Sequence, residues 1–371
     1  MDTKSKAREI VVRLRQEGYA AYWVGGCVRD PLLGLEPQDY DVATSARPQQ
    51  VIELFPGADA VGASFGVVLT DGIEVATFRS EAAYQDGRHP DQVRYETDPK
   101  LDAARRDFTI NAIFYDPLTD GYLDFFGGRA DIEAHLIRAV GVAGERFRED
   151  HLRLLRAIRF ATRFAFTVEA VTWQAILQNA SQIQLISAER IQEELNRMFT
   201  GPDPDRALLL LRESGLLRAI VPECRLERFP VPHPSLPLAW AALLQSCAEP
   251  RNILNALRFS NDSKKTILAI LASQPRIATA RDLPTAAFKK LIRQPNFADH
   301  LRLYGPHEIE DRIANTGDLF PAPLLNGADL LALGLPAGPR FKHLLNELED
   351  AQLAGTVTSR EEAIAFVLAR W

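Results

Sequence analysis

The feature that most constrains this chain is a pair of adjacent glycines at the end of an apolar run, followed by two closely spaced carboxylates. Gly25 and Gly26 follow the apolar residues 22–24, and Asp39 and Asp41 lie in a segment that alternates like a strand. Residues i and i+2 of a strand face the same side, so we expect Asp39 and Asp41 to point together. Glycines lack Cβ atoms, which lets their backbone approach a ligand closely and turn N–H groups toward a triphosphate.

The two carboxylates predict a cation site. Like charges on one face repel each other, and a fold keeps such a pair mainly where a cation neutralises it. Oxygen ligands favour a hard ion such as Mg²⁺, which leaves coordination positions for water and substrate phosphates. We therefore expect Mg²⁺ at Asp39 and Asp41. A lone Asp-x-Asp is more often a solvated turn or a strand edge, but its combination with Gly-Gly-x-Val-Arg-Asp favours a functional site.

Together, the glycine turn and the Asp pair resemble the signature of the nucleotidyltransferase superfamily that includes DNA polymerase β. More specifically, the chain resembles the class II tRNA nucleotidyltransferase and bacterial poly(A) polymerase family. The resemblance is strong over residues 22–195 and diffuse afterwards. Five segments match the family's motifs in order, namely residues 22–41, 105–112, 127–140, 149–160 and 187–195.

The resemblance implies roles for individual residues. It implies that Arg29 and Arg106 hold a triphosphate together with the two glycines. Asp107 and Asn111, in Arg-Arg-Asp-Phe-Thr-Ile-Asn-Ala, are implied to lie near the ribose and organise the pocket. Glu74 matches a third acidic, catalytic residue that the family has near its metal site. An outward-facing strand glutamate is the alternative for Glu74.

Residues 149–160 have a helical pattern, in which Asp150 and Arg153 lie three residues apart on one face. A salt-bridged helix surface is one interpretation. Another is base selection, because an ionised aspartate only accepts hydrogen bonds and an arginine only donates them. Asp150 would accept from the amino group of cytosine or adenine while Arg153 serves the ring acceptors. Uracil and guanine present a carbonyl instead, which the aspartate would repel.

The same helix resembles the family's fourth motif, Glu-Asp-x-x-Arg, at Glu149, Asp150 and Arg153. In the family, this motif selects C and A without a nucleic-acid template. Arg156 and Arg159 follow on the helix, where they are expected to hold phosphates or simply to support the helix.

Composition bounds the class of protein. A chain of 371 residues is too long for one ordinary core, so two or more units are expected. The net charge of −6 argues against coating nucleic acid by bulk electrostatics, although a local basic groove is compatible with it. No apolar stretch approaches a membrane span, and no signal-peptide core is found. Three cysteines without metal-ligand spacing indicate a reducing compartment, the cytoplasm, and no zinc.

These patterns predict an α+β fold. We expect a nucleotidyltransferase head with a mixed sheet and helices over residues 1–140, and a helical neck with the nucleotide-selecting helix over 141–200. An all-helical body and tail that bind tRNA are expected over 201–371. Within the head, Asp71-Gly72 predicts a hairpin turn. The polar residues 81–100 predict a long connection, and they resemble the family's flexible loop.

The resemblance implies template-independent addition of CMP and AMP to the 3′ end of tRNA from CTP and ATP. Two metal ions at the Asp pair would assist, and pyrophosphate would leave. A partial enzyme that adds only CC or only A, beside a partner enzyme, is an alternative. A poly(A) polymerase is less favoured because residues 62–66 resemble the tRNA enzymes and no basic Gly-Arg-Arg-Phe-like segment is found. An RNA-binding module with an inactive transferase head is the non-enzyme alternative.

Overall fold

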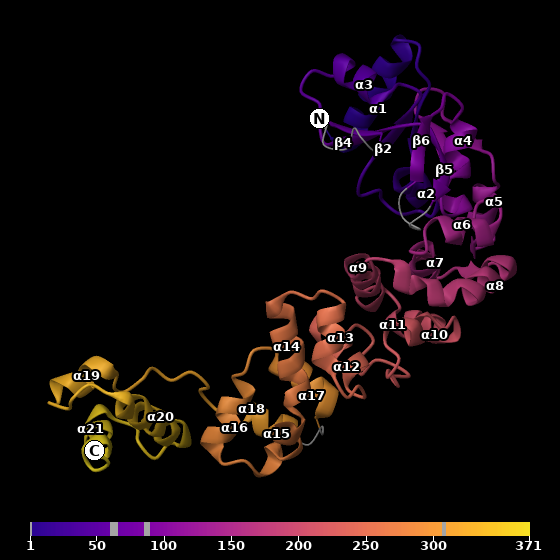
Figure 1. Cartoon of the computed structure of the whole chain (residues 1–371). Helices are drawn as coiled ribbons and strands as arrows, with labels where there is room; N and C mark the ends of the chain where they lie inside the picture. Colours follow the sequence, from indigo (N-terminus) through magenta and orange to yellow (C-terminus); the bar gives the residue numbers. More distant parts are fainter. Residues whose placement is uncertain (1, 60–65, 85–89, 306–308) are drawn as a thin grey trace. The chain divides into compact units, whose positions relative to one another are not determined.

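A computed structural model describes residues 2–59, 66–84, 90–305 and 309–371. Two compact units make up the chain, and we call them the first and second units (Figure 1). The first consists of Met1–His233 with Ser246–Phe259, and the second of Pro234–Gln245 with Ser260–Trp371. The expected division into head, neck and body with tail is finer than these two units and stays a prediction.

The first unit begins with a six-stranded sheet in the order β3-β4-β2-β1-β7-β8. β2 and β4 are parallel, and the other neighbours are antiparallel, so the sheet is mixed as expected. The strands are β1 (Ala21–Val24), β2 (Asp41–Thr44), β3 (Val67–Thr70), β4 (Ile73–Thr77), β7 (Ile113–Asp116) and β8 (Gly121–Asp124).

Two helices pack against this sheet. α1 (Thr3–Gln16) contacts β1, β2 and β4, and α3 (Pro48–Leu54) contacts β3 and β4. The residues of α1 that recur at helical spacing, Ala7, Ile10, Val11 and Leu14, are all buried. The amphipathic pattern of α1 therefore serves ordinary core packing.

The hairpin between β3 and β4 is confirmed. Asp71 and Gly72 both have left-handed backbones, with φ of 51° and 82°. Two consecutive positive φ angles are the requirement of a type I′ turn, whose twist matches the flanking strands.

The expectation of a structureless connection after residue 81 is wrong for much of its length. β5 (Arg79–Tyr84) and β6 (Pro90–Tyr95) form a two-stranded antiparallel sheet, and α4 (Pro99–Ala104) follows. Backbone hydrogen bonds between strands do not require apolar side chains, so a polar composition hides such a ribbon. Residues 85–89, in the middle of the resemblance to a flexible loop, lie outside the described residues.

The predicted helix over residues 149–160 is interrupted at its start. α6 (Ala143–Glu149) ends before Asp150, whose backbone is extended at φ −142° and ψ 104°, and α7 spans Arg153–Arg163. The Asp150 carboxylate accepts a hydrogen bond from the Leu152 backbone N–H, so the side chain competes with the helical ladder. Asp150 and Arg153 therefore do not share a helix face, contrary to the prediction.

Helices make up the remainder of the first unit apart from a short two-stranded sheet. α2 and α5 belong to the head, and a 3₁₀ turn, η2 (Thr109–Asn111), follows α4. The helices are α2 (Gly26–Leu32), α5 (Gly128–Glu133), α8 (Ala170–Asn179), α9 (Ala188–Phe199), α10 (Pro204–Glu213), α11 (Leu216–Ile220) and α13 (Pro250–Ala256), and the small sheet pairs β9 (Leu136–Ile137) with β10 (Thr167–Val168).

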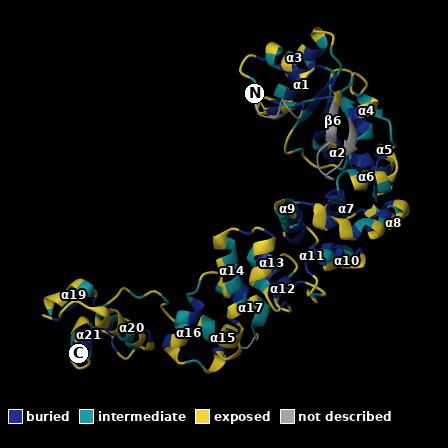
Figure 2. Ribbon diagram, in the orientation of Figure 1, coloured by how far each residue is buried: buried dark blue, intermediate teal, exposed yellow. Residues whose placement is uncertain are grey.

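The regular elements among the described residues of the second unit are all helices. α12 is almost entirely buried (Figure 2), and two further apolar clusters centre on Phe288 and Leu344. The helices are α12 (Leu236–Leu244), α14 (Asn261–Ala272), α15 (Gln274–Ala278), α16 (Thr285–Ile292), α17 (Phe297–Tyr304), α18 (Glu310–Ala314), α19 (Gly327–Ala332), α20 (Pro339–Ala354) and α21 (Arg360–Leu368). The α+β class, with a mixed head followed by helices, is confirmed. Among the described residues, no helix is long and apolar enough to cross a membrane.

Candidate active site

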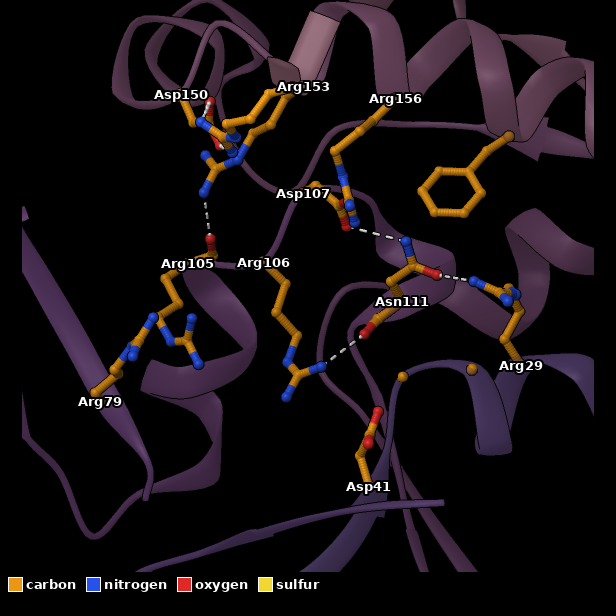
Figure 3. Close-up of a pocket in the computed structure, with 14 residues that line it drawn as sticks. Arg29, Asp41, Arg79, Arg105, Arg106, Asp107, Asn111, Asp150, Arg153 and Arg156 are labelled. Atoms are coloured by element: carbon orange, nitrogen blue, oxygen red, sulfur yellow. Dashed lines mark hydrogen bonds and ion pairs between the residues drawn. The ribbon is translucent and has the colours of Figure 1, made fainter. Parts of the chain in front are cut away.

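A cavity of about 470 Å³ lies in the first unit, between the glycine turn, the segment after α4, and the helices α7 and α9 (Figure 3). Seven arginines and three aspartates line it, so cationic groups dominate and a polyanionic ligand is favoured. The lining consists of Gly25, Gly26, Arg29, Asp41, Arg79, Arg105, Arg106, Asp107, Asn111, Asp150, Arg153, Arg156, Phe160 and Arg190.

Most of the site residues predicted from the sequence are brought together here. Asp39, Glu74 and Arg159 are not part of the lining. The arginines at 79, 105 and 190, and Phe160, line the cavity without having been predicted.

The glycine turn requires glycine at its first position. Gly25 has φ of 73° and ψ of −131°, a backbone conformation that residues with a Cβ rarely adopt. A Cβ built there would lie 3.7 Å from Asp41 Oδ2 and 3.9 Å from an Arg106 guanidinium nitrogen. The backbone of the turn therefore lies directly beside a carboxylate and an arginine of the cavity.

Two of the acidic residues are paired near the amino ends of neighbouring interior strands. Asp41 is the first residue of β2 and is in register with Glu74 of the parallel strand β4, whereas Asp39 lies two residues before the strand. The pKa of Asp41 is raised to about 6, mainly by burial and also by the nearby charges of Glu74 and Asp39, with Arg106 opposing the rise. Asp39 and Glu74 are exposed. This crowding of negative charge around a half-buried carboxylate fits a bound cation.

The donor set restricts how such a cation is held. Within the described ranges, no three side chains of the types His, Cys, Asp and Glu gather closely enough to form a metal cage. A hard divalent ion bound by one or two carboxylates takes its other ligands from water and substrate phosphates. Asp41 and its neighbour Asp39 fit that mode of binding, beside an arginine-rich cavity.

Asp102 holds two of the cavity arginines in place through ion pairs. The sequence patterns did not predict this role for Asp102. Its carboxylate, 1% exposed, accepts hydrogen bonds from Arg105 at 2.7 and 2.9 Å and from Arg106 at 3.0 and 3.3 Å. Burial raises the Asp102 pKa, but the two guanidinium groups outweigh it and the net pKa is lowered. The spacing of three and four residues from an acid on α4 to two arginines just after its end was the available signal.

A chain of hydrogen bonds crosses the floor of the cavity (Figure 3). Arg29 donates to Asn111 Oδ1 at 2.6 Å, and Asn111 Nδ2 donates to Asp107 Oδ1 at 3.0 Å. Arg156 of α7 donates to the other oxygen of Asp107 at 2.5 and 2.8 Å. Burial raises the Asp107 pKa, yet Arg156 and Asn111 hold it well below its usual range. Asp107 is therefore ionised, and the chain joins α2, η2 and α7 into one rigid unit.

The break between α6 and α7 places Asp150 and Arg153 in the same cavity. Arg190 of α9 donates to Asp150 Oδ2 at 2.9 Å, which holds the carboxylate in place. Arg153 donates to Glu149 at 2.7 Å and to the backbone carbonyls of Arg146 and Arg105 at 2.9 and 2.8 Å. A guanidinium has five N–H donors, so two of those on Arg153 are left for a ligand.

Arg159 lies elsewhere. Its guanidinium donates to Glu194 of α9 at 2.6 Å, and both side chains are buried. The structure therefore places Arg159 in an ion pair between α7 and α9, outside the cavity lining.

The fold and the cavity define a nucleotidyltransferase with a polymerase-type head. Residues 21–138 match the family described as poly A polymerase head domain, and residues 165–226 match that described as probable RNA and SrmB-binding site of polymerase A. A CCA-adding enzyme from Lactobacillus johnsonii is 34% identical, over 96% of this chain and 95% of the relative. The chain belongs to the family of CCA-adding enzymes, which are metal-dependent tRNA nucleotidyltransferases.

Solved structures agree. The Bacillus stearothermophilus CCA-adding enzyme in complex with CTP is 32% identical and superposes with a TM-score of 0.77, over 100% of this chain and 98% of that one. The Thermotoga maritima CCA-adding enzyme complexed with tRNA is 22% identical with a TM-score of 0.75, over 100% and 96% of the two chains. At that identity, the second comparison speaks for the fold alone.

Proposed function

We propose that this chain completes the 3′ end of tRNA, adding C, C and A from CTP and ATP without a nucleic-acid template. The observation that carries the proposal is that Asp150 and Arg153 share one arginine-lined cavity with Asp41. Groups suited to a base, a triphosphate and a metal-assisted transfer thus face the same space. Such an enzyme selects the base with side chains of its own chain, here at the junction of α6 and α7.

Base choice rests on the Asp150 carboxylate and the two spare donors of Arg153. The carboxylate accepts from the amino group of cytosine or adenine, and the guanidinium donates to the neighbouring ring acceptors. Uracil and guanine would place a carbonyl oxygen against the carboxylate. Arg190 supports this selection because its ion pair orients the Asp150 carboxylate.

The triphosphate is held by the glycine turn and by Arg106, with Arg29 behind the turn. The 3′-hydroxyl of the primer attacks the α-phosphate, the bond from that phosphorus to the bridging oxygen breaks, and pyrophosphate leaves. We assign Asp39 and Asp41 to Mg²⁺ and Glu74 to a supporting carboxylate beside Asp41. When bound there, Mg²⁺ supplies activation of the hydroxyl and neutralisation of the developing charge. Asp107 and Asn111 organise the pocket near the ribose, and Arg156 orients Asp107.

We place the enzyme in the cytoplasm. All three cysteines are free thiols in the structure, which fits the reducing compartment that their small number predicts. The tRNA itself is assigned to the helical residues after 200 together with the neck.

The test is incorporation of CTP and ATP, singly and together with Mg²⁺, onto tRNA transcripts that end before the tail, after one C, and after CC. Addition of all three nucleotides to the shortest transcript is expected. Arrest after CC, or addition of A alone to the CC-ended transcript, would instead identify a partial enzyme that works beside a partner. Asp41→Asn should abolish incorporation, whereas Glu133→Gln, an exposed control on α5, should not change it.

A further inference from the structure

A second cavity in the first unit shares no lining residue with the first. It has a volume of about 300 Å³, and its wall contains the rings of Trp23, Tyr40, Tyr115 and Tyr122. Lys4 and Arg8 of α1 also line it. A small concave site rich in aromatic rings with a few polar groups is the usual form of a small-molecule site.

Three of the aromatic residues form a row across adjacent strands. Trp23 of β1 is in register with Tyr115 of β7, which is in register with Tyr122 of β8. Their ring centroids are 5.5 and 5.0 Å apart, and the Tyr40 ring lies edge-on to Trp23 at 4.9 Å. Successive strand residues point to opposite faces.

The row therefore lies on the sheet face opposite the catalytic carboxylate. Val24, the neighbour of Trp23, is in register with Asp41, so these two share the other face. A ligand on the aromatic row would be separated from the catalytic cavity by the sheet. The two cavities are therefore able to bind ligands independently.

One buried donor in this wall lacks a partner. Trp23 is 5% exposed, and its indole Nε1–H makes no hydrogen bond with any described residue. Buried donors are nearly always satisfied, because burying them without an acceptor costs free energy. Two other polar groups of the wall have partners of their own: the Tyr115 hydroxyl donates to Asp120, and the Cys27 thiol donates to the Val24 carbonyl oxygen. A ligand acceptor would satisfy the indole.

The cavity lining also contains an arginine, Arg8, that is available to a ligand. Arg8 is exposed and forms no ion pair with any residue that the structure describes. Burial raises the pKa of Tyr40, and the nearby charges of Glu36 and Asp2 also raise it. The Asp2 carboxylate, however, already accepts a hydrogen bond from the backbone N–H of Ser5 as the cap of α1. Stacking faces, an unsatisfied donor and a free guanidinium match an aromatic base with acceptors and a phosphate.

We propose that this cavity binds a free nucleoside monophosphate, with its base on the Trp23–Tyr115 rings and its phosphate at Arg8. A volume of about 300 Å³ is at the lower end for small-molecule sites, which suits one nucleotide rather than a longer oligonucleotide.

The test is isothermal titration of the full chain with CMP and with AMP, in EDTA so that no divalent ion supports the catalytic cavity. Wild type and Arg106→Ala, which alters only the catalytic cavity, should bind alike. Arg8→Ala should weaken binding about tenfold through loss of the phosphate contact. Arg13→Ala, on the same helix but over the Phe55 ring, is the matched control and should bind as wild type does. Trp23→Phe keeps a ring but removes the donor, and about a fivefold loss is expected.

Thermal melts of the Trp23 variant exclude a folding defect, and Arg8→Ala, at an exposed position, tests the site independently. Absence of binding to the wild type at millimolar nucleotide would overturn the proposal. So would binding that disappears in Arg106→Ala and survives in Arg8→Ala, because the nucleotide would then lie in the catalytic cavity. Binding of tRNA that depends on Trp23, without binding of either monophosphate, would also refute a site for the free nucleotide.

Discussion

Replacing Asp150 by asparagine should change which bases are accepted. In the structure, Asp150 accepts hydrogen bonds from the Leu152 backbone N–H at 3.0 Å and from Arg190 at 2.9 Å. Both partners are donors, so the amide oxygen of an asparagine would take the position of Oδ1, which contacts the Leu152 N–H at 3.0 Å and Arg190 at 3.4 Å, and the NH₂ group would replace Oδ2. This NH₂ group would then face the cavity in place of an acceptor.

The size of the expected change in nucleotide preference follows from the hydrogen bonds that are lost and gained. Losing a hydrogen bond to a charged acceptor costs about 1.5–3 kcal/mol, or roughly 10- to 150-fold in kcat/KM for CTP and ATP. The new donor should favour UTP and GTP by up to a similar factor, since their carbonyl groups now find a partner. The preference for CTP over UTP, measured as the ratio of their kcat/KM values, should therefore fall roughly 10²- to 10⁴-fold, which corresponds to about 3–6 kcal/mol at most.

The assay is single-nucleotide extension of the three tRNA transcripts with each nucleoside triphosphate in turn. Asp98→Asn is the matched control: it makes the same chemical change at the N-cap of α4, where asparagine caps as well as aspartate. An equal loss with all four nucleotides would refute base selection by Asp150. It would mean that the residue acts only by anchoring Arg190 and the break between α6 and α7.

Three further outcomes are expected. Arg159→Met should destabilise the first unit by about 3–5 kcal/mol in urea unfolding, because Glu194 would be left buried without a partner. The KM for CTP should stay unchanged. A raised KM would instead indicate that Arg159 binds phosphate. Asp102→Ala should lower the free energy of unfolding in urea by about 3 kcal/mol and should reduce incorporation from CTP and from ATP equally. Unequal effects on the two nucleotides would contradict a purely positioning role. Burial lowers the pKa of His300 below its unfolded value of about 6.5, so its contribution to stability is present above that pH and is lost as the pH falls through the folded value. His300→Phe should flatten the fall of the urea midpoint below about pH 6.5, and an unchanged slope would show that other groups cause it.

Several features could be predicted from the sequence because their signals are local. The left-handed backbone at Gly25 needs glycine, and Arg106 and Asp107 stand in a contiguous motif. The hairpin at Asp71-Gly72 follows from the φ angles that these two residues tolerate. Such features depend on residues that are adjacent in the chain, so they survive without knowledge of tertiary contacts.

The helix break at Asp150 was missed although its cause is also local. Aspartate accepts from the backbone N–H two residues ahead, which favours a cap or a turn over a helix interior. Apolar spacing alone suggested a continuous helix, because Leu155 and Ile158 are buried on one side of α7. The turn that this side-chain hydrogen bond favours outweighed periodicity at this point.

The sequence by itself determined the class of fold, the glycine turn, the carboxylates and the arginine motif, because each is written in neighbouring residues. Only the tertiary structure decided which charges meet. Arg190, from α9, pairs with Asp150 across 40 residues of chain, whereas Arg159 turns from the cavity to Glu194. An arginine in a helical pattern has the same local signal whether it faces a ligand or a buried acid. Its role is decided by how α7 and α9 pack, which no short stretch of sequence contains.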